Sequence, residues 1–192
     1  MKKKLILISS KAITINTFLD QLIIDLKKNF QLTVYVSDPE NIKVKCKKKK
    51  IYLPTKYTDF VNFYKFFKNI IYIKKILKEK KDSEIFVHTP LAAHFIRLAL
   101  LFEKKKIVYF VHGFRFHKKT NIFFYSFFAF IEYLLKYKTK YYFVINSQDK
   151  NFVKNILRKN FYQINGIGIF LKKEIKKKFS SKKKFIVGVI AA

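Results

Sequence analysis

Hydrophobic and polar positions along the chain follow two alternating patterns. Short apolar runs are typical of buried parallel strands; they lie at residues 5–8, 32–36, 84–88, 107–111, 142–145 and about 161–164. Longer segments repeat apolar residues with a helical period, at residues 13–28, 60–80, 91–102, 122–136 and 147 to about 158. A lysine-interrupted strand region, residues 42–53, is expected near a sheet edge. This rhythm predicts an α/β fold, a Rossmann-like parallel sheet of about six or seven strands with helices on both faces.

Polar residues follow several of the predicted strands directly. They are Ser9-Ser10, His88-Thr89, His112-Gly113 and Asn146-Ser147. Ligands of open parallel sheets bind beyond the carboxyl ends of the strands. We therefore expect His88, His112 and Asn146 at one sheet edge, with Ser147 capping the helix that follows.

Each candidate residue also has an ordinary structural interpretation. The imidazole of His112, at the end of a strand and before a glycine, could hydrogen-bond a ligand, or it could be a loop histidine with local bonds only. His88 could contact a ligand, or it could belong to a helix start in which Thr89 is the N-cap and Pro90 the first helical residue. His94, inside the helix that follows, is expected to pack.

The last part of the chain has a different composition. Residues 172–184 are rich in lysine and lack any strand or helix period, which is typical of a linker. Residues 185–190 have a strand pattern with no following partner. The expected organisation is one domain over residues 1–171, a linker over 172–184, and, over 185–192, a stub of the first strand of a C-terminal domain that is missing.

Composition limits the choice of function. The formal net charge is +30, from 42 Lys and Arg against 12 Asp and Glu. Such a chain attracts nucleic acid, anionic lipid or phosphorylated ligands, although the coding bias of an AT-rich genome explains the lysines equally well. The apolar run 122–135 is short for a membrane span and contains Glu132, so it predicts a core helix or a membrane-surface helix. The single cysteine, Cys46, excludes an intrachain disulfide. The scattered histidines favour no metal site.

Four segments together resemble bacterial glycosyltransferase family 4, whose members have the two-domain GT-B fold. They are IFVHTPLAAHFIRLAL (85–100), IVYFVHGFRFHKK (107–119), YFVINSQDKNFVKNIL (142–157) and INGIGIFLKK (164–173). Their order and spacing are most similar to the branch that makes capsular polysaccharides and exopolysaccharides. The turn at residues 9–12 departs from the family pattern because it has no glycine.

The resemblance implies the N-terminal, acceptor-side half of an enzyme that transfers a sugar, with retention, from a nucleotide sugar to a lipid-linked or growing polysaccharide. It implies no metal or other cofactor. His112 matches the family histidine that faces the donor and is the expected catalytic residue. The expected donor-phosphate side consists of Ser9, Ser10, Lys11 and Gly113. The expected acceptor side consists of His88, Thr89, Arg115, His117 and Asn146.

The resemblance also implies partners and a location. The family's donor-binding half lies beyond the matched segments, so this chain alone is expected to be inactive. The expected location is cytoplasmic and peripheral, on the inner face of an anionic cytoplasmic membrane, without nucleic acid as a partner. The alternatives are a basic nucleic-acid-binding protein, which no recognition motif supports, and a membrane-surface protein without catalysis.

Overall fold

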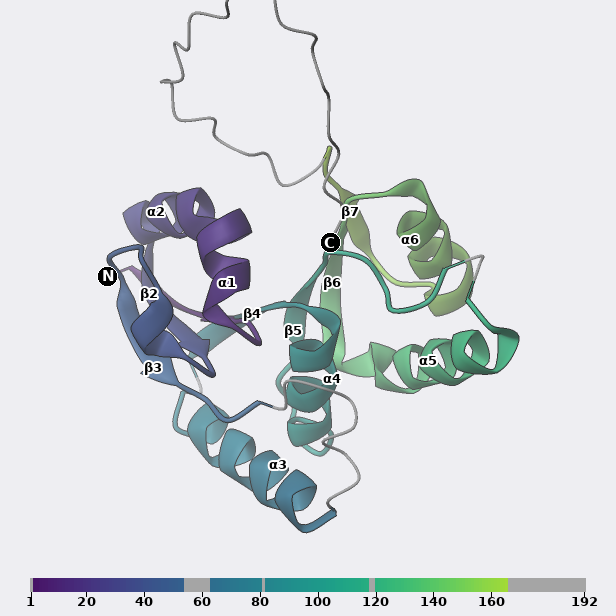
Figure 1. Cartoon of the computed structure of the whole chain (residues 1–192), viewed down its shortest axis with the longest axis horizontal. Helices are drawn as coiled ribbons and strands as arrows, with labels where there is room; N and C mark the ends of the chain where they lie inside the picture. The colour runs from purple at the N-terminus through teal and green to yellow at the C-terminus, as the bar shows by residue number, and fades with distance from the viewer. Residues whose placement is uncertain (1, 54–62, 81, 118–119, 166–192) are drawn as a thin grey trace, which may run out of the picture.

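The chain folds around one parallel sheet. The computed structural model describes residues 2–53, 63–80, 82–117 and 120–165. Within these ranges seven strands pair in parallel in the order β3-β2-β1-β4-β5-β6-β7 (Figure 1). The strands are β1 (Lys3–Ile8), β2 (Phe30–Val36), β3 (Lys47–Lys50), β4 (Ser83–His88), β5 (Ile107–Val111), β6 (Thr139–Val144) and β7 (Phe161–Gln163). The predicted Rossmann-like α/β sheet is confirmed, whereas the predicted linker 172–184 and stub 185–192 lie outside the described residues.

Helices connect these strands. They are α1 (Ala12–Thr14), α2 (Asp20–Asn29), α3 (Phe63–Lys78), α4 (Pro90–Ala99), α5 (Ile122–Leu135) and α6 (Ser147–Asn151). Wide π-helical turns join α1 to α2 (η1, Ile15–Leu19) and extend α6 (η5, Phe152–Leu157), and short 3-10 turns form η2 (Pro39–Asn41) and η4 (Lys136–Lys138). The helix predicted over residues 13–28 is therefore α1, η1 and α2 in succession.

The two faces of the sheet are covered unequally. Side chains alternate along a strand, so Leu5 and Leu7 of β1 face one way, onto the α1–α2 segment. Ile6 and Ile8 of β1 face the other way, into a larger core formed mainly with α3, α4 and η5. Figure 1 shows α1 and α2 on the opposite side of the sheet from α3 and α4. Over β4 to β7, the described segments pack on the face to which Ile6 and Ile8 point. The opposite face of these strands carries a row of aromatic rings, from Phe86 to Phe143.

The strand β3 is a lysine-covered edge. All four of its residues are lysines and all are exposed. Charged side chains on an edge strand oppose pairing with another chain. The edge position that the lysine-interrupted pattern predicted is confirmed.

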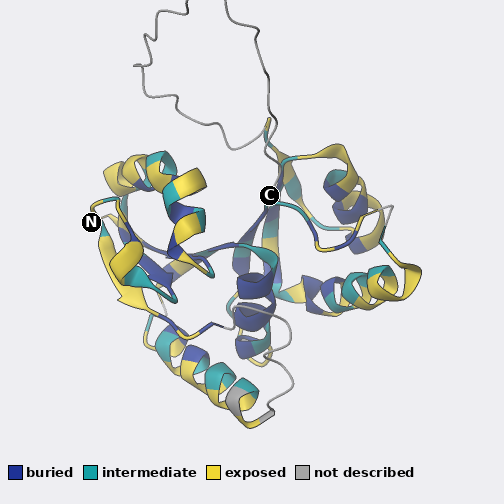
Figure 2. Cartoon of the chain, viewed as in Figure 1, coloured by how far each residue is buried: buried dark blue, intermediate teal, exposed yellow. Residues whose placement is uncertain are grey.

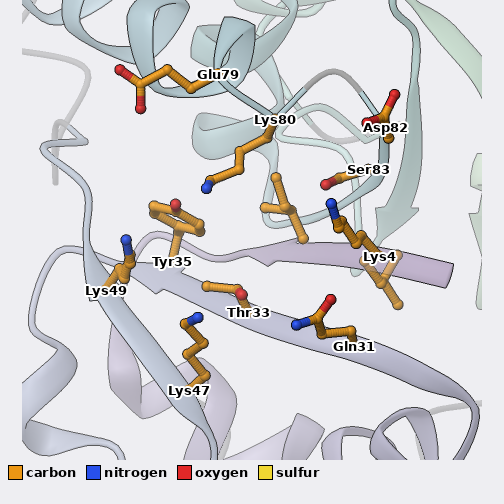
Figure 3. A pocket seen from close by; sticks show the side chains of 12 residues that line it. Lys4, Gln31, Thr33, Tyr35, Lys47, Lys49, Glu79, Lys80, Asp82 and Ser83 are labelled. Atoms are coloured by element: carbon orange, nitrogen blue, oxygen red, sulfur yellow. The ribbon is translucent and has the colours of Figure 1, made fainter. Parts of the chain in front are cut away.

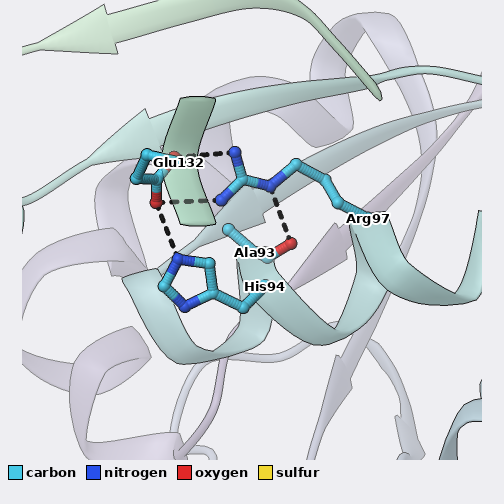
Figure 4. Close-up of polar contacts among 4 residues, drawn as sticks. All are labelled: Ala93, His94, Arg97 and Glu132. Carbon is cyan, nitrogen blue, oxygen red and sulfur yellow. Dashed lines mark hydrogen bonds and ion pairs between the residues drawn. The ribbon is translucent and has the colours of Figure 1, made fainter. Parts of the chain in front are cut away.

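A buried ionic network joins α4 to α5 (Figure 4). The Arg97 guanidinium donates from Nη1 to Glu132 Oε2 over 2.7 Å and from Nη2 to Oε1 over 2.9 Å. The His94 Nε2 atom lies 2.8 Å from the same Oε1, and Arg97 Nε donates to the Ala93 carbonyl. All three ionisable side chains are almost fully buried. The expectation that His94 packs inside the protein is confirmed, and the carboxylate that it contacts is the one that interrupts the apolar run of α5.

The remaining surface of α5 is apolar and largely exposed. Its exposed side chains include Ile122, Phe123, Phe124, Phe127, Phe130 and Leu134, with Phe123 81% exposed. In Figure 2, α4 is mostly dark blue, whereas α5 is largely teal and yellow. Of the two alternatives for this segment, a core helix or a membrane-surface helix, the exposed phenylalanines favour the second. Over the described parts of the chain, no helix combines the length and apolarity that crossing a membrane requires.

Candidate functional site

Two histidines meet at the carboxyl edge of the sheet. His88 is the last residue of β4 and His112 follows the last residue of β5. Since these strands are parallel neighbours, their carboxyl ends lie side by side. The His88 Nδ1 and His112 Nε2 atoms are 3.0 Å apart, which is a hydrogen bond. Asn146 follows β6 at the same edge, so the predicted grouping of the three residues is confirmed.

The backbone on both sides of this pair takes unusual conformations. Gly113 has a φ of 136°, a value that side chains strongly disfavour, although no heavy atom lies within 4 Å of where its Cβ would be. Thr89 has a φ of 73°, which is rare for a β-branched residue. Strain of this kind is concentrated at functional sites.

A second bond joins β1 to β4 at the same edge. The hydroxyls of Ser10 and Thr89 are 2.6 Å apart. In the sheet, β2 and β3 lie on one side of β1, and β4 to β7 lie on the other side. The strand order therefore reverses between β1 and β4. Ligands of doubly wound sheets bind at such switch points. Thr89 is the N-cap residue of α4 by position and Pro90 is the first helical residue, as predicted, but the Thr89 hydroxyl does not cap the helix.

Both histidines are neutral at pH 7. Burial lowers the pKa of His112 to about 4. Burial, and then repulsion from His112, holds the pKa of His88 well below its usual value. His88 is fully buried, whereas His112, to which it is bonded, is partly exposed and lies next to the ring of Phe18 in η1.

The surroundings of His88 favour one tautomer for each ring. The His88 Nε2 atom is buried and has no hydrogen-bond partner among the described residues. A buried acceptor without a partner is better tolerated than a buried N–H without one. We therefore assign the His88 proton to Nδ1, from which it donates to His112 Nε2. A neutral His112 then carries its own proton on Nδ1, where it can serve as a donor to a ligand.

The turn predicted to meet a phosphate already holds a carboxylate. Asp38, which follows β2, accepts a hydrogen bond of 2.8 Å from the backbone N–H of Ala12 at the start of α1. Ser10 accepts through its carbonyl from the Ser37 hydroxyl, and Ser9 is fully buried. Lys11 is exposed beside this turn. A phosphate here would approach Asp38, so the donor-phosphate role of Ser9, Ser10 and Lys11 stays a prediction.

The expected acceptor-side residues are spread over a wider surface. Asn146 caps α6: its Oδ1 accepts from the Asp149 N–H over 2.8 Å, and its Nδ2 donates to Asp149 Oδ2 over 2.7 Å. The prediction that Ser147 caps this helix is wrong by one residue, because Asn146 has the extended backbone that an N-cap requires. Arg115 and His117 are exposed in the loop after Gly113.

A cavity lies beside that loop, between α5 and the α6–η5 segment. Its volume is about 510 Å³. Its lining combines the aromatic residues Phe116, Tyr125 and Phe152 with the polar residues Gln148, Asn151 and Asn155. Flat rings beside amide groups suit a saccharide, which has both apolar ring faces and hydroxyls.

Sequence reasoning missed two residues of the site. Asp38 has a detectable signal, since it follows a strand at the carboxyl edge as the other candidates do. Phe18 has none, because it reaches His112 only through the wide turn of η1.

The sheet order, with a polar cluster at its switch point, defines a Rossmann-like α/β domain. A family model described as "Glycosyl transferase 4-like" matches residues 4–148. The chain belongs to the glycosyl transferase 4-like family, and its fold is that of the N-terminal half of a GT-B enzyme. The resemblance found in the four motif segments is thereby confirmed for the family; the capsular and exopolysaccharide branch stays a prediction.

Solved structures are similar to the chain at low sequence identity. A protein assigned as a UDP-N-acetylglucosamine 2-epimerase from Listeria monocytogenes matches with a TM-score of 0.54 and 15% identity, over 81% of this chain and 42% of that one. MurG from Acinetobacter baumannii matches with a TM-score of 0.49 and 12% identity, over 76% of this chain and 42% of that one. The chain thus spans less than half the length of both structures. No curated protein matches the sequence.

Proposed function

We propose that the chain is the acceptor-side domain of a retaining glycosyltransferase that moves a sugar from a nucleotide sugar to a lipid-linked or growing polysaccharide. The observation that carries the proposal is the bonded pair of His88 and His112 at the switch point of a glycosyl transferase 4-like domain. The expected absence of a metal ion is part of the proposal.

His112 is the residue that faces the donor. As a neutral ring with its proton on Nδ1, it donates a hydrogen bond to a sugar hydroxyl or to a leaving phosphate oxygen. A neutral donor needs no proton from solution at pH 7, because its pKa of about 4 keeps it uncharged. His88 was expected on the acceptor side, but it is fully buried. In this proposal it acts through His112, by holding the orientation and tautomer of that ring, and does not itself touch the acceptor.

The acceptor side faces a membrane. The apolar surface of α5 lies in sequence directly after the loop that carries Arg115 and His117. Exposed aromatic and apolar side chains enter the interfacial region of a bilayer, and neighbouring cations attract anionic lipid. A lipid-linked acceptor would be presented at this surface, next to the cavity that Phe116 and Tyr125 line. We propose that the protein acts at the inner face of the cytoplasmic membrane.

Transfer also needs groups that hold the nucleotide sugar. The family resemblance assigns them to a donor-binding half, and the solved structures of this fold are more than twice as long as the aligned region. Positioning the anomeric carbon against the acceptor hydroxyl supplies a large part of the rate. We therefore propose that this chain alone transfers no sugar.

The test is transfer from a panel of radiolabelled nucleotide sugars to an undecaprenyl-diphosphate-linked acceptor. The chain is assayed alone and joined to a donor-binding half from the same family. We expect transfer only from the joined protein, and a fall in its kcat of about a hundredfold or more for His112→Ala, the effect of removing one preorganised donor. Lys43→Gln, on an exposed side chain away from the site, is the matched control. Transfer by the chain alone, or full activity of the His112→Ala protein, would contradict the proposal.

A further inference from the structure

A second cavity opens on the sheet at the edge away from the histidine pair. Its volume is about 280 Å³; its floor is formed by residues 4–6 of β1 and by alternate residues of β2 from Gln31 to Tyr35, and its walls by β3 and the segment after α3 (Figure 3). Parallel sheets are normally covered on both faces. Here α3, which covers the face to which Ile6 and Ile8 point, ends at Lys78, so this corner of that face stays open. Neither the family match nor the proposed sugar transfer gives it a role.

Four lysines surround this cavity. They are Lys4, Lys47, Lys49 and Lys80. The strand register places three of them in neighbouring rows across the sheet, since Lys4 pairs with Gln31, Thr33 with Lys47 and Tyr35 with Lys49. Their positions are therefore set by the rigid sheet and not by a loop. Figure 3 shows the side chains of Lys47 and Lys80 extending toward the centre.

Within the described part of the chain, these lysines form no ion pair. The cavity also contains Glu79 and Asp82. Among the described residues, however, no carboxylate lies within 4.0 Å of any of the four ammonium groups. In Figure 3 the carboxylate of Glu79 points away from Tyr35 and Lys80. Four cations around one cavity repel each other unless an anion lies between them.

The lining also supplies neutral hydrogen-bond donors. The hydroxyls of Thr33, Tyr35 and Ser83 and the amide of Gln31 face the same space. Oxygens of a phosphate accept such bonds, and lysine binds phosphate as a point charge. The volume is near the lower end of ligand pockets, about 300 Å³, which favours a compact anion.

We propose that this cavity, which we call the lysine cavity, is a binding site for a phosphate-bearing anion of the size of a diphosphate. The site is separate from the donor site, because neither histidine lines it and the two lie on opposite faces of the sheet. Tyr35 packs in the core that Ile6 and Ile8 share, whereas the His88 ring lies beside Phe86, which packs against the other core. It does not depend on the proposed transferase activity.

The experiment titrates inorganic pyrophosphate into the chain at constant ionic strength and follows backbone amide signals by NMR. We expect saturable binding that shifts Thr33 and Tyr35 and leaves His112 unchanged. The double variant Lys47→Gln with Lys49→Gln should bind about tenfold more weakly, since two exposed charge–charge contacts of modest strength are lost. The matched control, Lys43→Gln with Lys154→Gln, removes the same charge at exposed positions outside the cavity.

Two results would overturn the proposal. One is the absence of saturation, and the other is equal weakening by the two double variants, which would mean that only net charge matters. Vesicles containing phosphatidylglycerol form a second arm. If they shift the same amides and compete with pyrophosphate, the bound phosphate belongs to a lipid headgroup; if they do not, it belongs to a free anion. Either result of that arm supports the lysine cavity.

Discussion

Replacing Glu132 by Gln should strongly destabilise the domain. The substitution keeps the size of the side chain and removes its charge. Arg97, which is fully buried, then loses the anion that its guanidinium contacts with two hydrogen bonds. An arginine stays protonated at any ordinary pH, so the variant contains a buried cation without a counter-charge.

Two estimates of the magnitude agree. Breaking a buried ion pair by removing one partner costs about 3–5 kcal/mol. The pKa of Glu132 gives an independent figure: burial alone would raise it, but Arg97 and His94 lower it from 4.5 to about 2. A shift of this size corresponds to about 3 kcal/mol of stability at neutral pH. Since domains of this kind are stable by about 5–15 kcal/mol, the loss is a large share of the total.

Urea unfolding followed by circular dichroism measures the effect. We expect the free energy of unfolding to fall by about 3–5 kcal/mol for Glu132→Gln. Glu84→Gln is the control, because Glu84 is exposed and 3.8 Å from Lys140, and it should change stability by less than about 1 kcal/mol. Adding Arg97→Met to Glu132→Gln should restore much of the loss, because the unpaired charge is then gone. A loss below about 1 kcal/mol for Glu132→Gln would refute the buried-charge reasoning.

Three further outcomes are expected. The wild-type chain should lose stability as the pH falls from about 4.5 to about 2, because the folded state holds Glu132 ionised below its unfolded pKa; urea titrations across this range should show a much smaller loss for Glu132→Gln. His112 should remain neutral down to about pH 4, with its proton on Nδ1, in nitrogen-15 NMR spectra; titration near pH 6.5 would show that the ring is solvated. Phe123→Ser with Phe127→Ser should weaken cosedimentation with anionic vesicles at least about tenfold, since burying one phenylalanine contributes about 1.5–3 kcal/mol, and should leave thermal unfolding unchanged because both rings are exposed. Unchanged sedimentation would argue against α5 as the membrane surface.

The sequence predicted those strands and helices that depend mainly on residues close to one another along the chain. Alternating apolar runs located β5, Ile107–Val111, at its observed bounds, and helical periodicity located the start and end of α5 to within a residue. Because parallel strands end at one edge, the grouping of His88, His112 and Asn146 followed directly.

The contacts inside the site could not be predicted in the same way. The Asp38 carboxylate reaches Ala12 across 26 positions of the sequence, and Arg97 reaches Glu132 across 35. No periodic pattern relates residues so far apart, and the wide turn that brings Phe18 to His112 has no known residue signature. Such contacts depend on how whole elements pack.

The position of Glu132 also settles how α5 is rotated about its own axis. A helix usually turns its apolar stripe inward and its polar stripe outward. In α5 nearly every side chain is apolar, so hydrophobicity alone leaves several rotations close in energy. One carboxylate, paired to a fixed guanidinium on α4, selects a single rotation, much as a lone buried polar residue selects the register of a coiled coil. The buried pair of Arg97 and Glu132 therefore determines which phenylalanines of α5 face outward. Without Glu132, α5 could rotate about its axis and expose different side chains.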